Sequence, residues 1–295
     1  MDGELLRWLY HRLIHDPTLA RTRNCTYGDG LILLIYFYAA LNNRSPLWAT
    51  DRCHWPAWCC AATVKWPSYS QLNKRLNADG AARGIDLINA ELRDRLPHTS
   101  AKVVDGKPLT IGGFSHDPDA AWGKVPGGWA NGYKLHVLVD GGGCGVIDAC
   151  AVTALDAGEA TVLRRGLVPR VDLRACTLRT DGNYDSNPTY AAVADAGGRM
   201  VAPRRRPGTG LGHDVRQHPD RLRAIEELER TPGGRAAHER MRNRVEQSLA
   251  HLTNLPWGLW ALPNFVRRLP RVRLWVAAKI TLYHLYKVLT RVAAA

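Results

Sequence analysis

The sequence predicts an α/β protein in which a mixed sheet flanked by helices follows a mostly helical N-terminal domain. Apolar residues recur at helical spacing up to about residue 99, and short apolar runs typical of strands begin at residue 101. Three of these strands follow one another in hairpin connection, and two later strands are each preceded by a helical stretch, an order that requires a mixed sheet. We therefore expect two domains, residues 1–100 and residues 101–295, the second including the C-terminal helices.

The N-terminal domain opens with two predicted helices. Leu5, Leu6, Leu9 and Leu13 recur at helix spacing, and the apolar run over residues 31–41 predicts a buried helix. That run is too short to span a bilayer, which requires about 20 apolar residues. The domain is therefore expected to pack its helices around an apolar core.

A third helix is predicted to begin after Ser68. Ser68 and Gln71 have the spacing of a capping box, in which each side chain accepts a hydrogen bond from a free amide at the helix start. Leu72 is expected to face the core, which leaves Gln71, Lys74 and Arg75 on a polar face. These three side-chain types hydrogen-bond base edges or phosphates, so the helix is a candidate DNA-recognition helix. An ordinary solvated helix face is the alternative interpretation.

The second domain begins as a run of strands and continues as alternating helices and strands. Strands are predicted at residues 101–105, 133–139, 145–152, 176–180 and 199–202, and helices at residues 158–167, 187–196 and 221–252, the last broken at residues 231–234. The C-terminal residues 269–292 are apolar but interrupted by basic residues, which predicts a packed amphipathic helix and argues against a membrane span.

The basic residues are concentrated near the C-terminus. The formal net charge is +13, and residues 1–100, 101–198 and 199–295 contribute +3, −2 and +12. A field of this sign attracts a polyanion, and the phosphate backbone of a nucleic acid is the most common one. A basic face that only keeps the protein soluble is the alternative.

The cysteines predict a reduced, cytoplasmic protein. The seven cysteines form an odd number without paired spacing, and no basic-then-apolar leader opens the chain. Cys53, His54, Cys59 and Cys60 come nearest to a metal-binding pattern, but they lack the repeated CxxC spacing of a zinc site. We therefore expect no structural zinc.

Three acidic residues stand at positions suited to chemistry. Asp105 and Asp181 each follow a predicted strand and precede a glycine, and Glu246 lies in a predicted helix. Side chains at such strand ends project into the crevice where α/β sheets bind ligands, and carboxylates that converge there require a cation. Taken singly, each residue has a simpler explanation as a turn-forming aspartate or as the helical ion-pair partner of Arg242.

Four segments of the second domain add a family resemblance. Residues 104–109 (VDGKPL), 132–136 (GYKLH), 180–186 (TDGNYDS) and 242–246 (RNRVE) resemble, in this order, the motif blocks of bacterial insertion-sequence transposases of the DDE type. The acids are 76 and 65 positions apart. The resemblance implies a ribonuclease-H-like catalytic domain with a mixed five-stranded sheet. Glu239 and Thr253 stand where related transposases usually have a tyrosine and a lysine.

The resemblance also implies an activity, a cofactor and partners. The expected function is that of a DNA transposase that cleaves transposon ends and transfers the strands into target DNA as a homodimer. Asp105 is expected to bridge two Mg²⁺ ions, which Mn²⁺ can replace, while Asp181 and Glu246 each bind one of them. Two alternatives stay open, an inactive DNA-binding descendant and a metal-dependent nuclease that does not join strands.

Further residues are candidates for DNA contacts. Lys134 and His136 alternate on one strand and therefore share a face, although a structural role is an alternative for His136. Arg204 and Arg205 follow the last strand and form a possible phosphate-binding patch. Arg242, one turn before Glu246, can hold a phosphate or pair with Glu246. With Gln71, Lys74 and Arg75 in the N-terminal domain, these residues complete the expected DNA-binding set.

Overall fold

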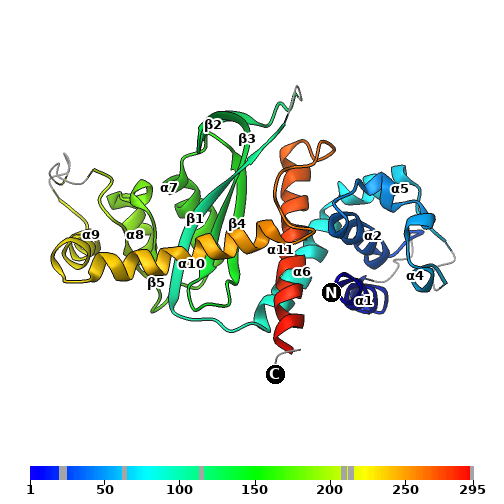
Figure 1. Cartoon of the computed structure of the whole chain (residues 1–295), viewed down its shortest axis with the longest axis horizontal. Helices are drawn as coiled ribbons and strands as arrows, with labels where there is room; N and C mark the ends of the chain where they lie inside the picture. Colours follow the sequence, from blue (N-terminus) through cyan, green and yellow to red (C-terminus); the bar gives the residue numbers. More distant parts are fainter. Residues whose placement is uncertain (20–24, 62–64, 113–115, 207–210, 212–215, 293–295) are drawn as a thin grey trace. The chain divides into compact units, whose positions relative to one another are not determined.

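The structure is a computed structural model that describes residues 1–19, 25–61, 65–112, 116–206, 211 and 216–292. Its contacts divide the chain into two compact units, Met1–Arg95 with Asn254–Ala295, and Leu96–Thr253. Residues 254–295, expected in the second domain, are grouped by their contacts with the N-terminal helices. Each unit is described by itself below, with the element labels of Figure 1.

The first unit is helical, as predicted for the N-terminal domain. It contains α1 (Asp2–Ile14), η1 (Pro17–Leu19), α2 (Asp29–Leu41), α3 (Pro46–Ala49), η2 (Arg52–His54), α4 (Ala57–Ala61), α5 (Tyr69–Leu76), α6 (Asp79–Asp94) and α11 (Leu269–Val292). Every residue of α2 after Asp29 is buried, which confirms the predicted buried helix. The capping box that joins Ser68 and Gln71 is present at the start of α5.

Helix α11 belongs to the first unit because its polar groups are bound there. The buried amine of Lys279 donates hydrogen bonds of 2.5 Å to the carbonyl oxygens of Ala40 and Trp257 and to the side-chain oxygen of Asn43. A buried ammonium must be fully hydrogen-bonded, and these partners supply three acceptors. Ala40 precedes Lys279 by 239 positions, so sequence spacing gave no sign of this contact.

Helices α1 and α2 approach each other closely at Gly30. A Cβ atom at this position would lie 2.0 Å from the carbonyl oxygen of Leu13. The Gly30→Ala substitution is therefore expected to lower the free energy of unfolding by about 1–3 kcal/mol, because the two backbones must move apart. Gly3→Ala is the matched control, since a Cβ there meets nothing within 4 Å. Urea denaturation measures both, and equal stability of the two variants would contradict the prediction.

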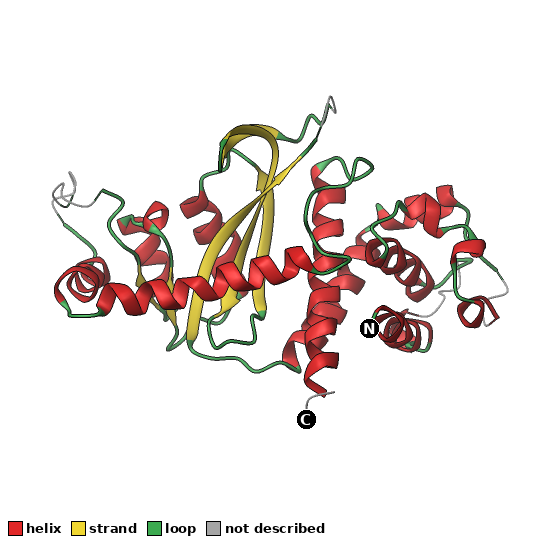
Figure 2. Cartoon of the chain, in the orientation of Figure 1, coloured by secondary structure: helices red, strands yellow, loops and turns green. Residues whose placement is uncertain are grey.

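The second unit is built on one mixed sheet (Figure 2). Its strands are β1 (Ala101–Thr110), β2 (Ala121–Val125), β3 (Gly128–Asp140), β4 (Ile147–Ala154), β5 (Thr177–Arg179) and β6 (Arg199–Val201). β3 pairs antiparallel with β1, β2 and β4, and β1, β5 and β6 are parallel in that order. The predicted mixed sheet and its five strands are confirmed, and β2 is a sixth strand that the prediction lacked.

Strand β2 escaped prediction because its sequence is dominated by turn signals. Gly123 interrupts it, and Pro126, Gly127 and Gly128 follow it directly. Gly127 has φ 89°, a conformation that only glycine adopts easily, and the turn of β2 into β3 needs it. The glycines that suggest a loop thus build a hairpin.

Helices cover the sheet, and the break between η6 and α10 lies at the predicted residues 231–234. The helices are α7 (Glu159–Val162), η3 (Leu163–Leu167), η4 (Val168–Arg170), η5 (Gly182–Tyr184), α8 (Asn187–Asp195), α9 (Pro219–Ile225), η6 (Glu226–Arg230) and α10 (Gly234–Asn254). Val104, Leu138 and Leu178 of the sheet share a core with η3 and α8. The long helix α10 crosses the sheet in the view of Figure 1, and it begins at the predicted break near residues 231–234.

Two further observations concern the whole described chain. In the ranges given above, no helix has both the length and the apolar character that crossing a membrane demands. All seven cysteines lie within these ranges and carry free thiols.

Candidate active site

The parallel pairing of β1 and β5 brings Asp105 and Asp181 together. Ala101 pairs with Thr177 and Val103 with Arg179, so two further steps along the same register place Asp105 opposite Asp181. Neighbouring strands lie about 4.8 Å apart. Asp181 lies two residues beyond the end of β5 and caps η5, where its carboxylate accepts a 2.9 Å hydrogen bond from the Asn183 amide. The two carboxylates thus meet at the carboxyl end of β5.

Burial and mutual repulsion destabilise the charged forms of both aspartates. Burial raises the pKa of Asp105, and the negative charges of Asp181 and Glu159 raise it further. Burial also raises the pKa of Asp181, and Glu159 again adds to the effect. Arg242 acts on both carboxylates in the opposite direction. The site is therefore an acidic cluster whose charges are only partly compensated.

Arg242 and Glu246 lie one turn apart on α10. The Arg242 guanidinium is 3.7 Å from the Glu246 carboxylate, and the Glu246 side chain is 58% exposed. The Nε atom of Arg242 is buried without a hydrogen-bond partner in the described part of the chain. The structure brings Asp105 and Asp181 close enough for their charges to interact, and the charge of Arg242 acts on both. Glu246 is not among the charges that act on either aspartate, and its contact in the described part of the chain is with Arg242.

Glu159 is a member of this cluster that sequence reasoning missed. It is the first residue of α7, and its charge acts on Asp105, Asp181 and the buried Tyr184. Its carboxylate forms an ion pair with Lys134 of β3. The available signal was its place at the start of a predicted helix directly after a predicted strand, where side chains point toward the same edge of the sheet.

His136, expected among the DNA contacts, is placed inside the protein. Its side chain is 1% exposed, and its Nε2 atom lies 3.0 Å from the Thr153 hydroxyl. Burial lowers its pKa to about 4. The expectation of a DNA contact is therefore corrected: His136 is a neutral core residue, because its face of β3 is covered at this position.

His238 ties α10 to the strand end that carries Asp181. Its Nδ1 atom lies 3.4 Å from an Arg179 nitrogen, and its Nε2 atom lies 3.1 Å from the Thr180 carbonyl oxygen. Since arginine only donates hydrogen bonds, Nδ1 accepts and Nε2–H donates to the carbonyl, which requires the neutral ring. Burial, followed by the charges of Arg179 and Arg242, lowers its pKa to about 4.

This neutral histidine predicts a loss of stability in acid. Between pH 6.5 and 4 the unfolded chain binds a proton at His238 while the folded chain does not, so stability present above pH 6.5 is lost as the pH falls. We expect His238 alone to remove up to about 3 kcal/mol over this interval. Urea denaturation at several pH values should show a shallower decline for His238→Gln, which keeps the donor but does not titrate. An identical pH slope would contradict the assignment.

Arg204 and Arg205, which follow β6, differ in their side-chain contacts and exposure. Arg204 forms two hydrogen bonds with Glu229, at 2.6 and 2.7 Å, whereas Arg205 is exposed. Arg204 and Arg242 both line a cavity of about 180 Å³ beside Gly182, the residue that follows Asp181. The cavity therefore adjoins the acidic cluster and carries basic side chains.

The candidates on α5 are mostly used within their own unit. Gln71 accepts a hydrogen bond from the Ser68 amide, and Arg75 donates one to the Tyr27 carbonyl and pairs with Asp29. Lys74 is exposed. Of the three, Lys74 thus has an exposed charge to offer a partner, while Arg75 is partly occupied by a structural role.

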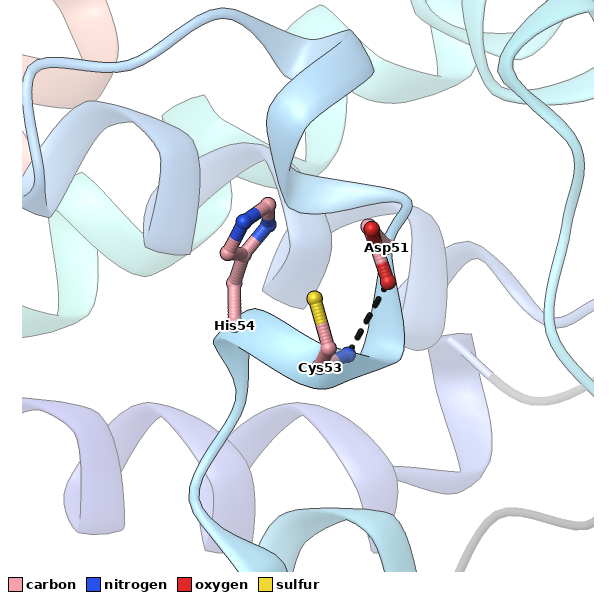
Figure 3. A group of neighbouring side chains, drawn as sticks. All are labelled: Asp51, Cys53 and His54. Carbon is pink, nitrogen blue, oxygen red and sulfur yellow. Dashed lines mark hydrogen bonds between the residues drawn. The ribbon is translucent and has the colours of Figure 1, made fainter.

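Among the described residues, two side-chain groups have ligand atoms within 4.8 Å of one another, and neither includes Asp105, Asp181 or Glu246. His98, Asp140 and Asp148 lie close together, but the buried Lys102 amine is 2.9 Å from Asp140 and 2.7 Å from Asp148 and supplies the positive charge there. Asp51, Cys53 and His54 form the exposed group in Figure 3. Asp51 accepts the Cys53 amide as a helix cap, and His54 Nδ1 lies 2.9 Å from the Trp48 carbonyl oxygen, so local packing accounts for their proximity.

Comparison with known proteins identifies the family. The model of the transposase DDE domain matches residues 97–285, which is more than half of the chain. The chain therefore belongs to this family of transposases, and the resemblance of its motifs to transposases of the DDE type is confirmed. No curated protein sequence matches it. A piggyBac transposase, solved by cryo-EM as a synaptic complex with hairpin DNA, matches 98% of this chain and 72% of its own, with 11% identity and a TM-score of 0.46.

Proposed function

We propose that the chain is an active transposase that cleaves DNA at transposon ends and joins the freed strands to target DNA. The observation that carries the proposal is the proximity of Asp105 and Asp181, which follows from the parallel pairing of β1 with β5 and is expressed in the interaction of their charges. Two partly buried carboxylates at this position have no structural advantage over neutral residues, because their mutual repulsion and desolvation are unfavourable. A bound catalytic cation would offset this repulsion and explain why both carboxylates are present.

The side chains present fit a hard divalent cation. Asp105, Asp181 and Glu246 offer only carboxylate oxygens, the ligands that Mg²⁺ prefers, and Mn²⁺ accepts the same set. The raised pKa values of the two aspartates indicate a site that gains stability when positive charge enters it. A pair of such ions, when bound, activates the attacking water or hydroxyl and stabilises the leaving oxygen.

The remaining side chains hold and orient the DNA. Arg242 lies near both aspartates and has a free Nε–H, which suits it to grip a phosphate oxygen beside the reacting bond. Arg204 and Arg205 are suited to bind the backbone further along, with Lys74 and Gln71 of the first unit as additional contacts. We expect a homodimer, since two transposon ends must be brought together.

The test is an assay with end-labelled DNA that carries the inverted repeats flanking the coding sequence, incubated with the purified chain and Mg²⁺. Joined products in addition to cleaved ends support the proposal. A mobility shift without cleavage would instead identify a DNA-binding descendant. Cleavage without joining, with Mg²⁺ and with Mn²⁺, would identify a nuclease.

A further inference from the structure

The hairpin of β2 and β3 carries two exposed tryptophans on one face (Figure 1). The side chains of Trp122 and Trp129 are 65% and 70% exposed. Trp122 pairs with Asn131 and Trp129 pairs with Lys124, and residues that lie opposite each other in antiparallel strands share a face. Trp122, Lys124 and Trp129 therefore form one surface, which we call the hairpin face. The two indole rings are diagonal neighbours on it.

The opposite face of the hairpin is packed against the protein. Gly123, between Trp122 and Lys124, points away from the hairpin face and is buried. A Cβ atom at Gly123 would lie 2.9 Å from the carbonyl oxygen of Leu155, the residue that follows β4. The hairpin is thus held by its other face, and the tryptophans contribute little to the core. Substitutions of either tryptophan should leave the fold intact.

The hairpin face continues the face of the sheet that carries Asp105. Asp105 lies opposite Val137 of β3, and Trp129 precedes Val137 by eight residues on the same strand. An even interval places both side chains on one side of a strand, and eight residues extend over at most about 27 Å. A DNA strand that lies along this face spans the distance in roughly eight nucleotide steps of about 3.4 Å.

The charge and the rings of the hairpin face together select the kind of partner. Lys124 is exposed and is the only charged residue between residues 121 and 131. A nucleotide offers a flat ring that stacks on tryptophan and a phosphate that attracts the lysine, whereas an apolar protein surface would leave the lysine unpaired. In a duplex the faces of the bases are covered by their neighbours. Unpaired bases are therefore the partners that fit both rings and charge.

We propose that the hairpin face binds unpaired bases of the DNA strand that enters the active site, with Trp122 and Trp129 stacking on bases and Lys124 holding a phosphate between them. The inference rests on the proposed function and deepens it, because it names a single-stranded segment as part of the substrate. Every base has a flat face, so this contact tolerates any sequence. It places a binding surface for DNA on a hairpin that carries none of the residues with proposed catalytic roles.

The experiment measures binding of a fluorescently labelled oligothymidylate of about 12 nucleotides to the full chain by anisotropy, without divalent ions. Trp122→Ala and Trp129→Ala should each weaken binding by about fivefold to a hundredfold, and Trp129→Phe should retain most of the affinity, since phenylalanine still stacks. Trp260→Ala, which removes a tryptophan that is 74% exposed in the other unit, is the matched control and should change nothing. A blunt duplex of the same length should bind all these variants equally.

A second variant tests the charge without altering a ring. Lys124→Gln should make the logarithm of the affinity for oligothymidylate less dependent on the logarithm of the salt concentration, by a slope of about 0.7. An unchanged slope would contradict the phosphate contact. This measurement also decides the proposal if an alanine variant fails to fold, which circular dichroism checks.

The outcomes separate the inference from the proposed function. Equal affinity of the wild type and the double variant Trp122→Ala/Trp129→Ala for oligothymidylate would overturn the hairpin face as a DNA site. Self-association that is lost in the double variant by sedimentation velocity, with oligothymidylate binding unchanged, would assign the face to contact between copies of this chain and would likewise overturn it. Cleavage is assayed separately with Mg²⁺, so a chain that binds oligothymidylate through its tryptophans but cuts no transposon end loses only the proposed function.

Discussion

Replacing Asp181 by asparagine is expected to lower the rate of DNA cleavage by about a thousandfold or more, at least about 4 kcal/mol in activation free energy. The carboxylate is one of the two that meet at the end of β5, and asparagine cannot supply its negative charge to a cation. The fold should be preserved, because asparagine is as good a helix cap as aspartate and can accept the hydrogen bond from the Asn183 amide.

The measurement is single-turnover cleavage of labelled transposon-end DNA, with DNA affinity measured in parallel. Affinity should change little, since the basic side chains that we propose as phosphate contacts are untouched. Asp172→Asn is the matched control, because Asp172 is an exposed residue of the same unit paired only locally with Arg174. Cleavage by Asp181→Asn at the wild-type rate would refute the assignment of this residue.

Replacing Lys102 by methionine is expected to lower the free energy of unfolding by about 3–5 kcal/mol. The Lys102 amine is buried near the start of β1, where it binds Asp140 and Asp148. Burial alone would lower the pKa of Lys102, but the two carboxylates raise it above its ordinary value. Methionine fills the space and leaves two buried carboxylates without their cation.

Urea denaturation of the wild type and the variant measures this effect. Arg174→Met is the control, since its ion pair with Asp172 is exposed, and its denaturation midpoint should not move. A loss below about 1 kcal/mol for Lys102→Met would show that the network contributes little. Activity per folded molecule should survive, because Lys102 lies three residues before Asp105 on β1 and its side chain therefore points to the other face of the sheet.

Local sequence signals predicted most of the second unit. Alternating apolar residues located five strands, and a Thr-Pro-Gly-Gly segment located the start of α10. They failed where tertiary contacts decide: α11 joins the N-terminal helices through Lys279, and β2 forms because its hairpin turn uses the glycines that suggest a loop. Such contacts have no local pattern.

The residues of the candidate site could be predicted from the sequence where they lie at strand ends. Asp105 and Asp181 stood at strand ends followed by glycine, so a sheet rule applied to them directly. Glu159 gave only the weaker signal of its place at the start of a predicted helix, and His238 gave none, because the relevance of both residues depends on which elements pack against the strand ends. Burial of His136 was equally invisible, since a half-exposed and a covered strand face can have the same alternation.

Three residues of α10 are spaced so that an insertion or deletion in this helix would displace them together. His238, Arg242 and Glu246 follow one another at intervals of four, so they occupy one stripe of the helix. His238 fixes the rotation of that stripe through the Thr180 carbonyl. Inserting or deleting one residue between His238 and Arg242 would rotate the rest of the helix by about 100° relative to His238. Arg242 and Glu246 would then both leave the stripe that His238 occupies. The protein should therefore tolerate an exchange of side chains along α10 more easily than a change in the length of this helix.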